Sequence, residues 1–304
     1  MIPDNPVSIL IIMTRSFDSQ NIKAIAIDLD GTTLLPEGIL GERTRICLQK
    51  LMMKGLQVII ATGRAIEASE KYYNAIGAQG PMVFFNGAEV ADVPSGKILY
   101  ANLIDLDVVD YGAEIARDLG AHYQVYLPAG ISPETGEEDL QQKWETLLID
   151  RQGPETDYYF RHTGITPVVK DLRSLLTLPI KGCIKGMFIA EPSLHDEIRK
   201  RIYERFGERI NVIRSFPTFL EILNNGVSKG DGLKIAMKHR GLKPEEVIAF
   251  GDEENDLSMF TAAGFAAAPQ NARKKIQEVA DLVYGSIEEE GLATWLEKIF
   301  LTND

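Results

Sequence analysis

The sequence predicts an α/β protein with a mainly parallel sheet and a second domain inserted into it. Strand-like and helix-like segments alternate over residues 22–87, and the same alternation returns after residue 228. The stretch between them is richer in polar loops and in alternating patterns. Because strand–helix–strand repetition is typical of parallel sheets, we expect the two outer stretches to build one domain and the middle stretch another.

The first outer stretch begins with a short apolar run at residues 22–28 (IKAIAID), as expected for a strand buried on both faces. A helix at 41–55 (GERTRICLQKLMMKG) follows and is closed by a C-terminal glycine. A second buried strand at 56–63, a helix at 64–77 and a third strand at 81–87 complete the pattern.

The second outer stretch repeats this order of elements. A helix at 228–242 precedes a strand that runs into acidic residues, over 245–256. The remaining expected elements are short: a helix at 256–264, a strand at 265–272, a helix at 272–280 and a strand at 280–285.

The middle stretch has strand-like pieces at 157–162 (DYYFRH), 184–190 (IKGMFIA) and 214–223 (RSFPTFLEIL), and a helix at 192–207. Alternation with few fully buried runs favours a more antiparallel sheet covered on one side. The acidic segment 136–145 (GEEDLQQKWE) is interpreted as the solvated face of a helix.

These patterns divide the chain into three parts. We expect an N-terminal extension at 1–20, a core built from 21–87 and 225–304, and an inserted domain at 88–224.

Composition limits the partners of the protein. The formal net charge of −12 argues against a nucleic acid or an anionic membrane surface, which would require a basic face. Cys47 and Cys183 are too few for a disulfide framework, so we expect buried thiols and a cytoplasmic location. The apolar run at 6–13 is far shorter than the ~20 residues of a spanning helix.

Acidic side chains end two of the expected core strands. Asp28 and Asp30 project to the same side of an extended chain, and their charges repel unless a cation lies between them. Asp252 follows the strand of the second stretch, and Asp256 lies four residues on. Carboxylate oxygens with no cysteine or histidine nearby favour Mg²⁺. In open parallel sheets ligands bind at the carboxyl ends of the strands, so we expect these acids to form one site.

Two further features point to an anion. Lys229 lies at the start of an expected helix, where a positive charge opposes the helix dipole and an anionic partner explains it better. Thr62 and Gly63 offer a hydroxyl and backbone N–H groups at a strand end, as phosphoryl oxygens require.

Four motifs, in this order, resemble those of the haloacid dehalogenase (HAD) superfamily of phosphohydrolases. They are DLDGT at 28–32, TGR at 62–64, SKG at 228–230 and GDEEND at 251–256. Three longer segments resemble the Cof-type (HAD-IIB) sugar-phosphate phosphatases: VFFNGAEV at 83–90, FLEILNNGVSKG at 219–230 and PQNA at 269–272. The resemblance implies a Rossmann-like core sheet with an inserted α/β cap domain of the C2B type.

The resemblance also implies residue roles. Asp28 would be the nucleophile that forms an aspartyl-phosphate, and Asp30 the general acid and then the general base. Thr62 and Lys229 would hold the phosphoryl oxygens. Mg²⁺ would be bound by Asp28, Asp252, Asp256 and the backbone carbonyl of Asp30. Candidates for substrate or loop contacts are Gly63, Arg64, Asn86, Asn255 and Asn271.

We therefore expect a Mg²⁺-dependent phosphomonoester hydrolase acting on small phosphorylated metabolites, with sugar phosphates as the expected substrates. Two alternatives stay open. A phosphomutase of the phosphomannomutase kind shares the cap position and would return the phosphoryl group to the sugar. A non-catalytic protein that binds phosphometabolites would leave its ligands intact.

Overall fold

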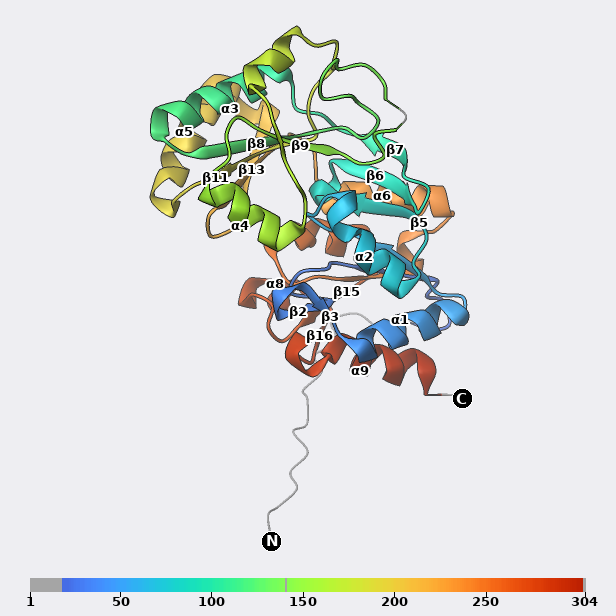
Figure 1. Ribbon diagram of the computed structural model, residues 1–304. Coiled ribbons are helices and arrows are strands. Elements are labelled where there is room, and N and C mark those ends of the chain that lie inside the picture. The colour runs from blue at the N-terminus through green and yellow to red at the C-terminus, as the bar shows by residue number, and fades with distance from the viewer. Residues whose placement is uncertain (1–17, 140, 303–304) are drawn as a thin grey trace. The chain divides into compact units, whose positions relative to one another are not determined.

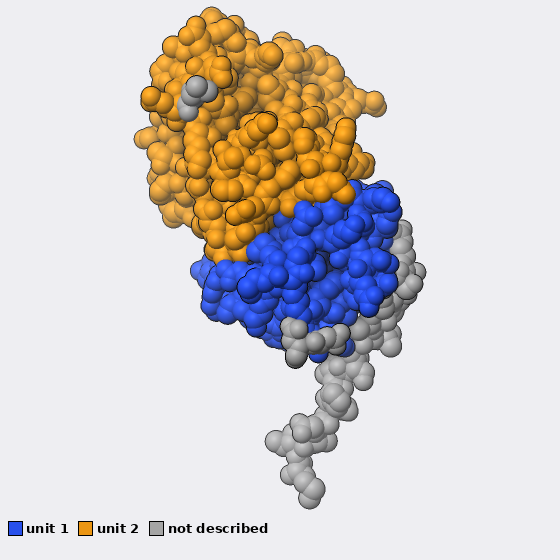
Figure 2. Space-filling view, turned by 90° about the vertical axis from the view of Figure 1, so that its right-hand side faces the viewer, with its two compact units in different colours: residues 1–58, 242–304 blue, residues 59–241 orange. Residues whose placement is uncertain are grey.

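The computed structural model describes residues 18–139 and 141–302, apart from the side chains of His162 and Phe216. The chain divides into two compact units, one of residues 1–58 with 242–304 and the other of residues 59–241 (Figure 2). The predicted domain boundaries near 87 and 225 differ from this division and stay a prediction. Of the predicted extension at 1–20, residues 1–17 lie outside the described part of the chain.

A five-stranded sheet follows the predicted apolar runs, with strand order β16-β15-β14-β1-β4. β1 pairs in parallel with β14, β14 with β15, and β15 with β16. The central strands are apolar and fully buried, as a parallel sheet requires. The strands are β1 (Ala24–Ile27), β4 (Gln57–Ile60), β14 (Val247–Phe250), β15 (Phe265–Pro269) and β16 (Leu282–Tyr284).

Helices of the first unit pack around this sheet. α1 (Glu42–Met53) buries Cys47, Leu48 and Leu51 and contacts α9 (Gly291–Leu296). The short helices α7 (Leu257–Ala262) and α8 (Lys274–Val279) contact β15. A two-stranded sheet joins β2 (Leu34–Leu35) to β3 (Ile39–Leu40).

The third predicted strand, at 81–87, is β5 (Gly80–Phe84), and its pairing differs from the prediction. A parallel bridge joins Val83 to Ala61, just beyond β4, but β5 forms an antiparallel ladder with β6 (Glu89–Val93). β7 (Lys97–Ala101) completes this three-stranded sheet. α2 (Ile66–Ile76) precedes β5, and α6 (Lys229–Arg240) packs against it.

A second, six-stranded sheet, here called the cap sheet, has the order β10-β9-β8-β11-β13-β12. Only the pairing of β9 with β10 is parallel among its described ladders, so the predicted antiparallel character is confirmed. The strands are β8 (His122–Leu127), β9 (Thr146–Ile149), β10 (Val168–Val169), β11 (Lys185–Ile189), β12 (Ile210–Phe216) and β13 (Phe219–Asn224).

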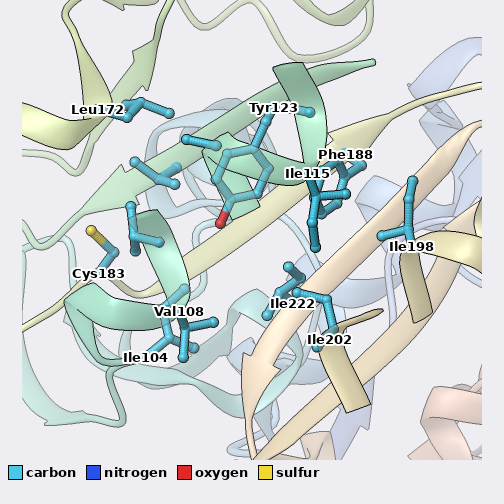
Figure 3. Close-up of a cluster of buried hydrophobic side chains, with 14 of the residues drawn as sticks. Ile104, Val108, Ile115, Tyr123, Leu172, Cys183, Phe188, Ile198, Ile202 and Ile222 are labelled. Atoms are coloured by element: carbon cyan, nitrogen blue, oxygen red, sulfur yellow. The ribbon is translucent and has the colours of Figure 1, made fainter. Parts of the chain in front are cut away.

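One face of the cap sheet builds a hydrophobic core. α3 (Leu106–Leu119) and α5 (His195–Phe206) cover this face, whereas α4 (Pro154–Thr163) lies over the other (Figure 1). Tyr123, Phe188 and Ile222 of the sheet meet Val108 and Ile198 of the helices (Figure 3). Because side chains alternate along a β strand, the residues adjacent to Tyr123, Phe188 and Ile222 in the sequence point to the opposite face of the cap sheet, which α4 covers.

Two predictions for this region are wrong. Residues 157–162 form part of α4 rather than a strand, because Pro154 fits the first helical turn and Gly164 ends the helix in a left-handed conformation. The segment 136–145 contains no helix among its described residues, and Glu145 at its end is buried rather than solvated. Over all described residues, no helix combines the length and the apolarity needed to cross a bilayer.

Candidate functional site

Three carboxylates of the first unit converge at the carboxyl ends of neighbouring strands. Asp28 follows β1, and Asp252 and Asp256 follow β14. One oxygen from each lies within 4.8 Å of the others, and all three side chains are buried. The parallel register of β1 with β14 explains why residues so distant in the sequence meet.

The loops that carry these acids are closely fitted. Gly31 has φ +80, and a Cβ at that position would lie 2.2 Å from Asp252 Oδ2, so the loop after β1 requires glycine here. The Thr32 hydroxyl donates to Asp252 Oδ1 over 2.9 Å. Asp256 Oδ2 accepts the backbone N–H groups of Asp252 (2.9 Å) and Glu253 (3.0 Å). These bonds hold the Asp252 and Asp256 carboxylates in place.

The donor set fits a hard divalent cation. Three ionised carboxylates this close repel one another strongly unless a cation lies between them. Burial raises the pKa of Tyr284 well above its usual range, and the negative charges of Asp252, Asp256 and Asp28 raise it further. Oxygen ligands without sulfur or nitrogen suit Mg²⁺ better than zinc or copper.

The other predicted residues of the first unit surround this cluster in different ways. The Asp30 side chain is exposed and lies outside the three-carboxylate group, and its predicted metal contact is through its backbone carbonyl. Asn271 Nδ2 donates to Gly31 O over 2.8 Å, and its Oδ1 accepts the N–H of Ile287 over 3.0 Å. Asn271 therefore holds the loop after β1. Asn255 is half-buried in the turn between Asp252 and Asp256.

Predicted residues of the second unit gather around the end of β4. Thr62 is fully buried, its N–H donates to Val83 O over 2.9 Å, and its hydroxyl accepts the N–H of Arg64 over 3.2 Å. The N–H of Asn86 donates to Thr62 O over 3.0 Å. A Cβ on Gly63 would lie 3.0 Å from Asn86 Oδ1, so the Thr62–Arg64 turn and Asn86 touch.

Lys229 is the first residue of α6, and its side chain is almost fully buried. The Ser228 hydroxyl caps the helix by accepting the N–H of Asp231 over 3.1 Å. A Cβ on Gly87, which has φ +100, would lie 2.0 Å from Ser228 O. The start of α6 thus presses against the turn that contains Asn86.

Sequence reasoning missed two charged residues of this neighbourhood. Asn86 Nδ2 donates to Glu221 Oε2 over 3.1 Å, and Lys185 Nζ lies 3.1 Å from Glu221 Oε1. Both charged side chains are buried. The available signal was a single charge within each apolar strand, in FLEIL and in IKGMFI.

Comparisons with known proteins agree on one family. Residues 25–296 match the family of haloacid dehalogenase-like hydrolases. The chain is 30% identical to the 5-amino-6-(5-phospho-D-ribitylamino)uracil phosphatase YitU of Bacillus subtilis, over 91% of this chain and 97% of that protein. It is 27% identical to an HMP-PP phosphatase of Cronobacter sakazakii, over 83% of this chain and 85% of the relative.

The fold gives the same result. A crystal structure of a haloacid dehalogenase-like hydrolase from Bacteroides thetaiotaomicron superposes with a TM-score of 0.80 at 25% identity, covering 92% of this chain and all of that one (100%). The predicted α/β class, with a parallel core sheet and an inserted cap sheet, is confirmed. With its motifs, its carboxylate cluster and its fold in agreement, the chain belongs to the haloacid dehalogenase-like hydrolases, as a phosphatase of the Cof type.

Proposed function

We propose that this phosphatase hydrolyses small phosphorylated metabolites, sugar phosphates among them, with Mg²⁺ and through an aspartyl-phosphate intermediate. The buried group of Asp28, Asp252 and Asp256 carries the proposal, because it places a potential nucleophile among carboxylates that require a cation. A cation bound there would neutralise negative charge on Asp28 and on the incoming phosphoryl group.

Asp28 and Asp30 divide the chemistry. An Asp28 oxygen forms a bond to phosphorus as the bond from phosphorus to the leaving alcohol breaks, and Asp30 gives that alcohol its proton. Asp30 then takes a proton from water, whose oxygen attacks phosphorus and releases Asp28 with inorganic phosphate. Asp30 is exposed, so water can reach it for the second step.

Thr62, Gly63 and Lys229 are proposed to bind the phosphoryl oxygens, an assignment that rests on their match to the family motifs. The charge that spreads over these oxygens during transfer favours fixed hydrogen-bond donors and an ammonium group. Arg64, Asn86, Asn255 and Asn271 are the proposed second set of substrate or loop contacts.

The substrate class and the location are proposals supported from two directions. One relative is named for a phosphorylated ribitylamino-uracil and another for HMP-PP. The net charge of −12 disfavours polyanions and anionic membranes as partners, so we propose a small-molecule substrate. We propose a cytoplasmic location because Cys47 and Cys183 are free and buried, as is usual in a reducing compartment.

Phosphate release from a panel of sugar phosphates, nucleotides and other phosphoesters tests this function. We expect release that requires Mg²⁺ and that is lost in Asp28→Asn but retained in Asp196→Asn, a matched change at an exposed aspartate of α5. Asp30→Asn should slow substrates with poor leaving groups most, because these need the proton.

Three outcomes would redirect the proposal. Phosphate release that persists in Asp28→Asn would contradict the assignment of Asp28 as the nucleophile. An isomerised sugar phosphate in place of free phosphate would identify a phosphomutase. Tight binding of sugar phosphates without turnover, in folded wild-type protein, would identify a binding protein.

A further inference from the structure

The face of the cap sheet opposite the hydrophobic core contains a buried charged pair. Lys185 of β11 and Glu221 of β13 are 3% and 4% exposed. Glu221 lies opposite Met187 in the antiparallel register, and Lys185 lies opposite Tyr126 of β8, so both charges are in the middle of the sheet. The proposed chemistry uses neither residue.

Glu221 is bonded to three different segments. Its Oε1 accepts from Lys185 Nζ over 3.1 Å and from the Ser215 hydroxyl over 2.8 Å. Its Oε2 accepts from Asn86 Nδ2 over 3.1 Å. Lys185 and Ser215 belong to the cap sheet, whereas Asn86 belongs to the turn after β5. One carboxylate thus ties the cap sheet to that turn.

Aromatic rings enclose the pair. Lys185 Nζ lies 5.4 Å from the ring centre of Phe85 and 5.6 Å from that of Tyr126, and the Tyr126 and Tyr159 hydroxyls are 2.7 Å apart. Burial lowers the pKa of Lys185, but Glu221 and Tyr159 together outweigh burial and raise that pKa overall. A buried ion pair is often no more stabilising than an apolar pair of the same shape. Its presence here therefore calls for a role other than stability.

Asn86 connects Glu221 to the Thr62–Arg64 turn, which is proposed to bind the phosphoryl group. Its backbone is left-handed, with φ 57, a conformation that asparagine adopts more readily than most residues. Its N–H holds Thr62 O over 3.0 Å, while its side chain lies against Gly63. Asn86 therefore contacts Thr62 through its backbone and Gly63 through its side chain, so a displacement of Asn86 would disturb both.

We propose that Glu221, paired with Lys185, is a positioning residue that acts through Asn86 to hold Thr62 and Gly63 in place for the phosphoryl group. The inference rests on the proposed function in one respect, namely that Thr62 and Gly63 bind phosphoryl oxygens. Since every substrate presents the same phosphoryl group, loss of Glu221 should lower kcat/KM for all substrates by a similar factor.

Glu221→Gln and Ser215→Ala form a matched test pair. Ser215→Ala removes only the bond from the Ser215 hydroxyl to Glu221 Oε1. Glu221→Gln instead changes the carboxylate itself, including Oε2, which accepts the hydrogen bond from Asn86. We expect Glu221→Gln to lower kcat/KM by about 10- to 100-fold, since misplacement of a reacting group by about 1 Å has effects of this size. Ser215→Ala should stay within about twofold of the wild type. Glu221→Asp, which keeps the charge but shortens the reach to Asn86, replaces Glu221→Gln if the latter does not fold.

A double-variant cycle separates positioning from general damage. If Glu221 acts through Asn86, Glu221→Gln should have little further effect on kcat/KM in an Asn86→Ala background. A merely structural role predicts that folded Glu221→Gln protein has wild-type kcat/KM and a lower melting temperature. Losses that differ widely among substrates would show that Glu221 contacts the leaving group, and would overturn the inference.

Calorimetric binding of inorganic phosphate in the presence of Mg²⁺ keeps this test independent of turnover. We expect Kd for phosphate to rise about tenfold in Glu221→Gln and to stay unchanged in Ser215→Ala. A wild type that binds phosphate but hydrolyses no ester would contradict the proposed function while leaving this comparison intact. Equal phosphate affinity in wild type and Glu221→Gln would contradict the positioning role, even in an active enzyme.

Discussion

Two buried acids should make the stability of the second unit depend on pH. Glu89 begins β6 and Glu145 directly precedes β9, and both side chains are buried. Burial raises the pKa of Glu145 from its ordinary 4.5 to about 7. Burial, with the neighbouring Glu145 charge, raises the pKa of Glu89 well above its usual range. The fold therefore holds protons at neutral pH that the unfolded chain has released.

The sign follows from these directions. A carboxyl whose pKa is raised by folding favours the fold at low pH, and that contribution is lost as the pH rises toward the folded pKa. For Glu145 the loss extends from pH 4.5 to about 7. At about 1.4 kcal/mol per pKa unit, this amounts to about 3 kcal/mol. Glu145→Gln cannot ionise, so its stability relative to the wild type should improve by about that amount over the same range.

Urea unfolding followed by tryptophan fluorescence at pH 5, 6, 7 and 8 measures this difference. Glu137→Gln, at an exposed acid of the same segment, is the matched control and should run parallel to the wild type. If the free energies of unfolding of Glu145→Gln and wild type keep a constant difference from pH 5 to pH 8, the reasoning from burial is refuted.

Three further changes test other parts of the structure. Gly87→Ala should lower the free energy of unfolding by more than about 2 kcal/mol, because its Cβ would lie 2.0 Å from Ser228 O. Gly226→Ala, where φ is +76 and the surrounding space is open, should cost about 1 kcal/mol in the same urea assay. Equal losses in the two variants would contradict the close approach at Gly87. Phe188→Ala, at a fully buried position of the cap core, should cost about 3–5 kcal/mol in thermal unfolding, and a loss below about 1 kcal/mol would count against that core. Asp256→Asn should abolish the rise in melting temperature that Mg²⁺ gives the wild type, because one of three carboxylates is lost, and an unchanged rise would place the cation elsewhere.

Local pattern was sufficient for the core strands and for the acids that end them. β1 and β14 are apolar runs without competing signals, and their parallel pairing follows from the strand–helix–strand order. Asp28, Asp252 and Asp256 were predictable as a cluster because strand ends of a parallel sheet share one edge.

Tertiary contacts decided the rest. The aromatic run at 157–162 favours a strand by propensity, but Pro154 and Gly164 set the bounds of a helix whose Tyr159 is buried. Glu221 and Asn86 are 135 residues apart, so no local pattern links them. The same holds for Thr32 and Asp252, which are 220 residues apart.

The most direct test of the phosphatase mechanism is to trap the phosphorylated protein. The enzyme is mixed with Mg²⁺ and with an ester that it hydrolyses, labelled on the phosphoryl group. The reaction is quenched in acid within one turnover, and the protein is digested for peptide mapping. The account predicts label on the peptide that contains Asp28, and none in Asp28→Asn. Full turnover of the substrate with no labelled protein at any quench time, or label on another residue, would contradict it.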